Sequence, residues 1–233
     1  ALLADEMPER DRVYRMLEGA ANFAHVQEFE SLVDRFLKQI DPNQPLDYFK
    51  RTPFQLAAGL GSVHAMTQLL GGGAVVDSIA LRKALYWPEC VVWFLDRGAD
   101  SEGVDDWGVT CLMQACLRGL TGTVEILLKH RARVDTQEVD GRTALWFSSR
   151  NRRQRCVELL LAAGAEPNLP DHYGRTPLMR AKNLAIAKLL LEAGADPTVR
   201  DSDGQSAYDL AGGRWEFRQI LAAAEDTRLQ GAQ

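Results

Sequence analysis

The chain has 233 residues, of which 46% are hydrophobic and 25% charged, as is ordinary for a soluble globular protein. Its formal net charge of −5 gives no electrostatic case for nucleic-acid binding, which calls for a basic face. No apolar run approaches the roughly 18 residues that span a bilayer, and the charged, amphipathic start is unlike a secretory signal. We therefore expect a cytoplasmic protein without membrane insertion. Because Ala1 stands where an initiator Met would be, we expect the natural N-terminus to lie upstream.

Residues 1–45 are predicted to form an N-terminal helical cap, with helices over 9–17 and 25–40. The second helix carries an apolar stripe with the i, i+3, i+4, i+7 spacing of an amphipathic helix. That stripe consists of Val26, Phe29, Leu32, Val33, Phe36 and Leu37. A cap over the segment that follows would bury the stripe, and a separate helix hairpin that binds a partner is the alternative.

After residue 45 a similar sequence motif repeats along the chain. Its opening glycines are Gly108, Gly141, Gly174 and Gly204, at spacings of 33, 33 and 30. A fixed period near 33 residues is typical of stacked supersecondary units. Such stacks build an extended surface rather than a closed pocket, which argues against an enzyme.

One unit, residues 138–170, illustrates the local chemistry. Gly141 suits a turn that needs a permissive backbone, and Thr143 suits the N-cap of a first helix. A second helix carries Leu160 and ends at Gly164, which is typical of a left-handed C-cap. Neither helix alone can bury its apolar face, so neighbouring units must stack.

The opening Gly174-Arg175-Thr176-Pro177-Leu178 and the close Gly194-Ala195-Asp196 resemble the ankyrin repeat. The resemblance covers about residues 46–226. It implies an all-α ankyrin-repeat solenoid, in which helix-turn-helix pairs stack and β-turn tips project. We expect five repeats and a C-terminal cap at 46–77, 78–104, 105–137, 138–170, 171–200 and 201–226, followed by a flexible tail at 227–233.

Several repeats depart from this pattern. The second is short and lacks the Thr-Pro opening, and we expect its Trp87 and Trp93 in the core. The fifth has lost three residues in its first helix or in the turn after it. Arg131 stands where a cap glycine belongs, and a left-handed non-glycine residue costs roughly 1–2 kcal/mol.

Little in the sequence indicates catalysis. The four histidines lie in different segments without metal-ligand spacing, and Ser148-Ser149 lacks a nucleophile-elbow motif. Cys90, Cys111, Cys116 and Cys156 show no CxxC spacing and are predicted to be reduced core residues. We therefore predict no catalytic residue, metal or cofactor.

Four arginines, Arg150, Arg152, Arg153 and Arg155, lie within six residues of the fourth repeat. One interpretation is a solvated turn between helices, paired with acidic residues of a neighbouring repeat. The other is a contact for an acidic partner surface, because Arg binds carboxylates in bidentate geometry.

The ankyrin resemblance implies binding through the turn tips and the exposed side of the first helices. Exposed aromatic residues are costly unless they bind, and Trp, Tyr and Arg are enriched at interface hot spots. The predicted partner-binding residues are Tyr48, Phe49, Arg51, Asp106, Trp107, Met113, Arg118, Arg142, Trp146, Arg150, Arg152, His172, Tyr173 and Arg175.

We predict a non-catalytic module, monomeric on its own, that presents a preformed concave surface to another protein of complementary charge. The alternatives are an inhibitor or immunity-type protein that blocks a specific effector or enzyme, and a regulatory fragment of a larger protein. An enzyme or small-molecule binder would need polar groups converging in a pocket, and the sequence shows none.

Overall fold

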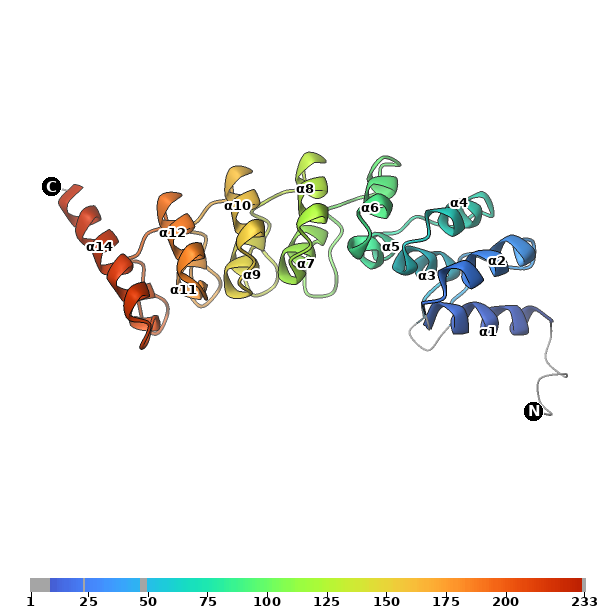
Figure 1. Cartoon of the computed structure of the whole chain (residues 1–233), viewed down its shortest axis with the longest axis horizontal. Helices are drawn as coiled ribbons and strands as arrows, with labels where there is room; N and C mark the ends of the chain where they lie inside the picture. Colours follow the sequence, from blue (N-terminus) through green and yellow to red (C-terminus); the bar gives the residue numbers. More distant parts are fainter. Residues whose placement is uncertain (1–8, 23, 47–49, 232–233) are drawn as a thin grey trace. The chain divides into compact units, whose positions relative to one another are not determined.

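The computed structural model describes residues 9–22, 24–46 and 50–231, and side chains for residues 12–226 within those ranges. Helices, turns and loops make up the described residues, without strands. The chain divides into two compact units, residues 1–101 and 102–233. Each unit is a set of helix pairs (Figure 1), as the all-α prediction requires.

The first unit begins with an extra helix pair ahead of the repeats. Its helices are α1 (Glu9–Asn22), α2 (Val26–Phe36), α3 (Pro53–Leu60), α4 (Val63–Gly71), α5 (Ser78–Lys83), the 3₁₀ helix η1 (Ala84–Tyr86) and α6 (Pro88–Leu95). α1 packs against α2 and α3, and α2 packs against α4. The apolar stripe of α2 is buried at Phe29, Leu32 and Val33, so this pair covers the first repeat as a cap would.

The second unit contains four further pairs. They are α7 (Cys111–Arg118) with α8 (Thr121–Lys129), α9 (Ala144–Arg150) with α10 (Gln154–Ala162), α11 (Pro177–Arg180) with α12 (Leu184–Glu192), and α13 (Ala207–Leu210) with α14 (Trp215–Gly231). The first helices pack in one row and the second helices in another (Figure 1). α14 continues through residue 231, into the segment 227–233 expected as a tail, and residues 232–233 lie outside the described residues.

Threonine caps begin the first helices of the regular repeats. The hydroxyls of Thr110 and Thr143 each accept a hydrogen bond, 3.2 Å long, from the backbone N–H three residues on. Pro53 and Pro177 occupy the first helical turn, where the missing N–H costs nothing. Thr176 has the same extended backbone, but its hydroxyl makes no cap bond.

The irregular repeats differ from the expectations in one place. The first helix of the fifth repeat has four residues, against seven in the fourth, so the missing residues come from that helix. Trp93 is buried as expected. Trp87 is exposed and the core expectation for it is wrong, because its indole lies over Gly61 and donates to the Gly59 carbonyl at 3.0 Å.

The core contains the apolar residues of both helix rows. Val157 and Leu160 of α10 are fully buried, as are Leu127 of α8 and Leu190 of α12. All four cysteines are buried and outside disulfide bonds, which confirms the core prediction.

Replacing Leu160 by Ala should lower the free energy of unfolding by about 2–5 kcal/mol, because the lost side chain leaves a cavity between neighbouring repeats. Guanidinium denaturation of the whole chain measures this. The matched control is Leu161→Ala in the same helix, whose side chain is only partly buried and should cost less. A loss below about 1 kcal/mol for Leu160→Ala would contradict the register.

Arg131 adopts a left-handed conformation with φ +63°, where the next two repeats have Gly164 and Gly194. Arg131→Gly should raise the free energy of unfolding by about 1 kcal/mol, because glycine takes this backbone without strain. The reciprocal change Gly164→Ala should lower it by about 1 kcal/mol, since the added Cβ meets no atom within 4 Å and only backbone strain is introduced. Equal stabilities for all three chains would reject strain at these caps.

Candidate protein-binding surface

Three of the turn tips of the second unit are closed by aspartates, and the tip at residues 138–142 is closed by Glu138. One carboxylate oxygen of Asp105, Asp171 and Asp201 accepts hydrogen bonds from the backbone N–H groups two and four residues on, at 2.9–3.0 Å. Each turn then reverses at a glycine with positive φ, such as Gly108 and Gly174. This pairing holds the two residues between them at the outermost point of the tip.

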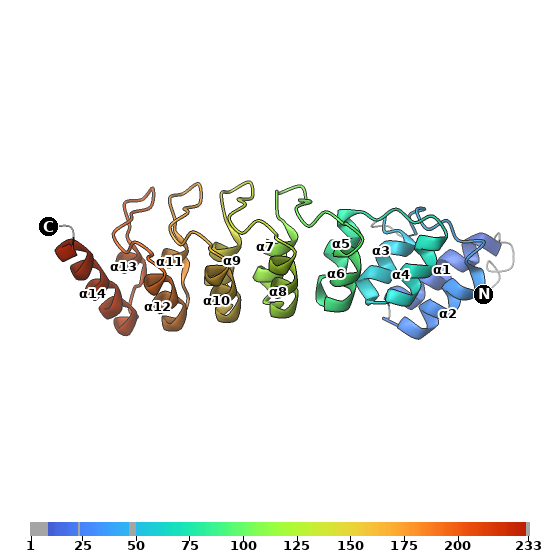
Figure 2. The ribbon, with the colours of Figure 1, turned by 90° about the horizontal axis from the view of Figure 1, so that it is seen from above.

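Neighbouring tips are joined by backbone hydrogen bonds. The N–H of Val139 donates to Trp107 at 3.0 Å, that of His172 to Asp140 at 2.9 Å, and that of Ser202 to Tyr173 at 2.9 Å. The tips thereby form a continuous row along one edge of the unit (Figure 2). We call this row, at residues 105–109, 138–142, 171–175 and 201–205, the ledge. The Trp107 side chain is 65% exposed and that of Tyr173 is 49% exposed on this ledge.

An apolar cleft of about 320 Å³ opens between the tips of the third and fourth repeats. Trp107 and Val139 come from the tips, while Leu117 and Phe147 come from α7 and α9. Arg142 lies at the cleft as well, with its guanidinium paired to Asp140 at 2.7 Å. The remaining lining residues are Val109, Met113, Glu138 and Asp140. The cleft can therefore accept an apolar side chain beside a charged rim.

The residues predicted to bind a partner fall into four groups. Asp106, Trp107, Arg118, Arg150, Arg152, His172 and Tyr173 are exposed, whereas Arg51, Arg142 and Arg175 are partly exposed. Met113 and Trp146 are buried, and Tyr48 and Phe49 lie outside the described residues. Arg51 belongs to the first unit, where it donates to the Asn22 side chain at 3.0 Å.

The expectation of exposed contacts at Met113 and Trp146 is wrong. Met113 is 1% exposed and lines the cleft from within α7. Trp146 is 2% exposed because the guanidinium groups of Arg142, Arg150 and Arg180 lie 5.0, 5.4 and 5.3 Å from its ring. Cations over an indole face are attracted by its quadrupole, so Trp146 holds these arginines in place.

The arginine cluster of the fourth repeat separates into two halves. Arg155 pairs with Glu158 at 3.0 Å and with Glu125 of the preceding repeat at 3.5 Å. The Nε–H of Arg153 donates to the Leu117 carbonyl at 3.3 Å. Arg155 has the acidic neighbouring-repeat partner of the first interpretation, and Arg153 contacts a backbone carbonyl of that repeat instead. Arg150 and Arg152 form no ion pair among the described residues.

Three further basic residues, Arg180, Lys182 and Arg214, lie near that cluster and were missed. Burial lowers the pKa of Arg180, and the charges of Arg150 and Arg175 lower it further. Burial also lowers the pKa of Lys182, again with Arg180 and Arg214 adding to the effect. A basic residue recurs near the end of each first helix from Arg118 onward. This recurrence at the same position of each repeat could have predicted the three residues from the sequence.

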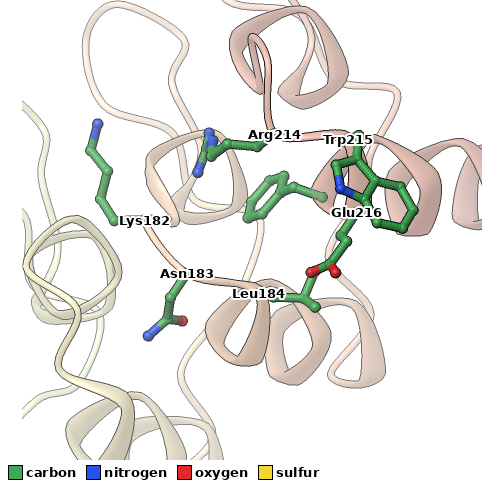
Figure 3. A pocket seen from close by; sticks show the side chains of 7 residues that line it. Lys182, Asn183, Leu184, Arg214, Trp215 and Glu216 are labelled. Atoms are coloured by element: carbon green, nitrogen blue, oxygen red, sulfur yellow. The ribbon is translucent and has the colours of Figure 1, made fainter.

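A second pocket of about 290 Å³ adjoins these residues. Leu184, Trp215 and Phe217 form its apolar part, and Trp215 is 63% exposed. Figure 3 shows Arg214 extending toward the side of Lys182 and away from Trp215. The Arg214 guanidinium lies 4.3 Å from the Phe217 ring centre and donates to the Ala181 carbonyl at 3.2 Å. Asn183 and Glu216 complete the lining.

Within the part of the chain that the structure describes, no group of three or more His, Cys, Asp or Glu side chains is placed to hold a metal ion. Among the same residues, no helix is both long and apolar enough to cross a membrane.

The model of the family "Ankyrin repeats (3 copies)" matches residues 78–171 and 136–201. The chain belongs to the ankyrin-repeat family. The crystal structure of the human ASB11 ankyrin repeat domain superposes with a TM-score of 0.75 at 25% identity, over 90% of this chain and 97% of that domain. Ankyrin repeats are generally protein–protein interaction modules, and their fold is typically non-catalytic.

Curated relatives match part of the array. Human BCL-6 corepressor-like protein 1 is 34% identical over 102 residues, which are 42% of this chain and 6% of that protein. The Arabidopsis thaliana E3 ubiquitin-protein ligase XBAT33 is 36% identical over 96 residues, 41% of this chain and 19% of the ligase. The mouse B-cell lymphoma 3 protein homolog is 33% identical over 99 residues, 42% of this chain and 22% of the homolog. The matched segments thus span less than a quarter of each relative.

Gly174→Ala should lower the free energy of unfolding by about 2 kcal/mol, because φ is +73° and the new Cβ would lie 3.1 Å from the Asp201 backbone. Gly204→Ala is the matched control, with φ +75° and open space around the Cβ, and should cost about 1 kcal/mol. Urea unfolding of both variants measures the difference. Equal losses would show that close approach of the tips does not restrict position 174.

Proposed function

We propose that this chain is a non-catalytic module that binds another protein through the ledge of turn tips and the apolar cleft behind it. The observation that carries the proposal is the cleft between Trp107 and Val139, which is apolar, open and built from two neighbouring repeats. Exposed apolar surface of this kind is typical of a protein-interaction site.

The ledge is suited to binding because its geometry exists before a partner arrives. Backbone hydrogen bonds join the tips, and a carboxylate side chain closes each turn, an aspartate in three repeats and Glu138 in the fourth. A preorganised surface loses little conformational entropy on association. Trp107 then offers a large apolar area to the partner, as aromatic hot-spot residues do.

The charged groups around the cleft support binding rather than catalysis. The Glu138 carboxylate accepts from the Arg142 N–H at 3.0 Å, and the Arg142 guanidinium pairs with Asp140. These groups are engaged in holding the tip. The relative XBAT33 is named as a ubiquitin ligase, but the match spans a fifth of it, and we propose a binding role alone for this chain.

The four buried cysteines form no disulfide, which supports a reducing compartment, and we propose the cytoplasm. If a partner binds the ledge with its own active surface, the chain would inhibit that partner. If the partner binds the ledge with another part of its surface, the chain would tether it.

A double variant, Trp107→Ala with Leu117→Ala, tests the ledge. It should weaken the binding of a captured partner by on the order of tenfold or more, because the apolar wall of the cleft is removed. Affinity capture with the whole chain identifies the partner, and titration calorimetry with the purified partner measures Kd.

The control, Lys129→Ala with Lys188→Ala, changes exposed residues of the second helices α8 and α12 and should leave Kd unchanged. Both variants should keep their unfolding free energy within about 0.5 kcal/mol of the parent. A partner retained equally by the cleft variant would overturn the proposed site, and binding lost only in the control would move it to the second helices.

A further inference from the structure

Basic side chains gather in the second unit where its first helices end. We call this group the basic strip: Arg150, Arg152, Arg180, Lys182 and Arg214. The strip crosses successive repeats, because α9 packs against α11, α11 against α13, and α12 against α14. It lies in a chain whose net charge is −5, so the positive charge is local.

No member of the strip forms an ion pair with a carboxylate among the residues that the structure describes, and the one carboxylate whose charge acts on Arg180 is that of Asp171. Arg155, Arg175 and Arg200 each pair with one or two acidic side chains at 3.0–3.5 Å. Arg150 and Arg180 instead lie over the Trp146 ring. Burial lowers the pKa of Lys182, and the like charges of Arg180 and Arg214 lower it further. An anion placed here would relieve that repulsion.

Arg152 occupies a backbone position that other repeats give to glycine. Its φ is +60°, against +77° at Gly61 and +78° at Gly119, which precede the second helix in their own repeats. A left-handed conformation is unfavourable for a side chain with a Cβ, and Arg152 forms no ion pair within the described residues that would offset it. Backbone strain that no structural contact offsets is typical of functional positions.

The pocket at Trp215 adjoins the strip. Lys182 and Arg214 of the strip line it together with the apolar side chains of Leu184, Trp215 and Phe217, and Asn183 and Glu216 complete the lining. Figure 3 shows the cationic side chains and the Trp215 indole around the same hollow. A ligand that fits both parts carries negative charge and, next to it, a bulky apolar group.

We propose that the basic strip binds an Asp- and Glu-rich segment of a partner protein, with an apolar side chain of that segment in the Trp215 pocket. This inference rests on the proposed protein-binding function and names the partner's chemistry. Guanidinium groups bind carboxylates with matching bidentate geometry. A peptide segment fits better than nucleic acid, because the acidic remainder of the chain would repel a long polyanion while the pocket takes an apolar side chain.

A random peptide library displayed on phage and panned against the whole chain tests the chemistry without assuming a sequence. Selected peptides should be enriched in Asp and Glu beside a bulky apolar residue. Fluorescence anisotropy with a labelled selected peptide then gives Kd, which should rise with ionic strength as exposed charges are screened.

Arg152→Gly separates binding from folding. It should raise Kd by on the order of tenfold through loss of a strip charge, while stability stays equal or increases because glycine suits the backbone. Arg131→Gly is the matched control, since it replaces an arginine of similar φ outside the strip and should leave Kd unchanged. Trp215→Ala should raise Kd without reducing its salt dependence.

Selected peptides without acidic enrichment, or a Kd unaffected by Arg152→Gly, would overturn the inference. If such peptides were lost with the Trp107 and Leu117 variant, the proposed function would stand without the strip. Tighter binding of a single-stranded RNA oligonucleotide than of the selected peptide would also overturn it. A library from which the chain enriches nothing would count against both the inference and peptide binding at the ledge.

Discussion

The hydrogen bond that each turn tip donates to the tip before it is the constraint on which the second unit depends. It links Val139 to Trp107, His172 to Asp140 and Ser202 to Tyr173. The tips can approach this closely because the turn reverses at glycine, and a Cβ at Gly174 would meet the backbone of the next tip. The ledge, the exposed positions of Trp107 and Tyr173 and the cleft all follow from tips held in register.

Local chemistry made the framework predictable from sequence. The glycine spacing, the threonine caps and the left-handed backbone at Arg131 each depend on a few neighbouring residues, and each is present in the structure. Which side chains of the first helices are buried was harder to predict from the sequence, because these helices are short and packed on both sides by other first helices. The buried residues of α9 are Ala144, Leu145, Trp146, Ser148 and Ser149, so the prediction of an exposed Trp146 on this helix was wrong.

The turn tips were predictable from the sequence, and so were Arg150 and Arg152 of the strip, but Arg180, Lys182 and Arg214 were not. Trp107 and Tyr173 lie at the outermost point of an aspartate-closed turn, which the sequence pattern locates directly. Trp146 is buried by arginines from three separate segments, and that arrangement exists only after the repeats stack. The short α11 adds to this, because it ends at Arg180 and so brings that guanidinium to the Trp146 ring.

The two kinds of charge have separate tasks in the second unit. Carboxylates at Asp105, Asp171 and Asp201 accept backbone hydrogen bonds inside the tips, so their charge is used to close turns. Arg150 and Arg180 end the first helices, where the exposed carbonyl groups favour a cation. The helix ends and the Trp146 ring therefore position these guanidinium groups without a carboxylate partner. Because Arg150 and Arg180 form no ion pair among the described residues, we propose the strip as a binding surface rather than an internal ion-pair network.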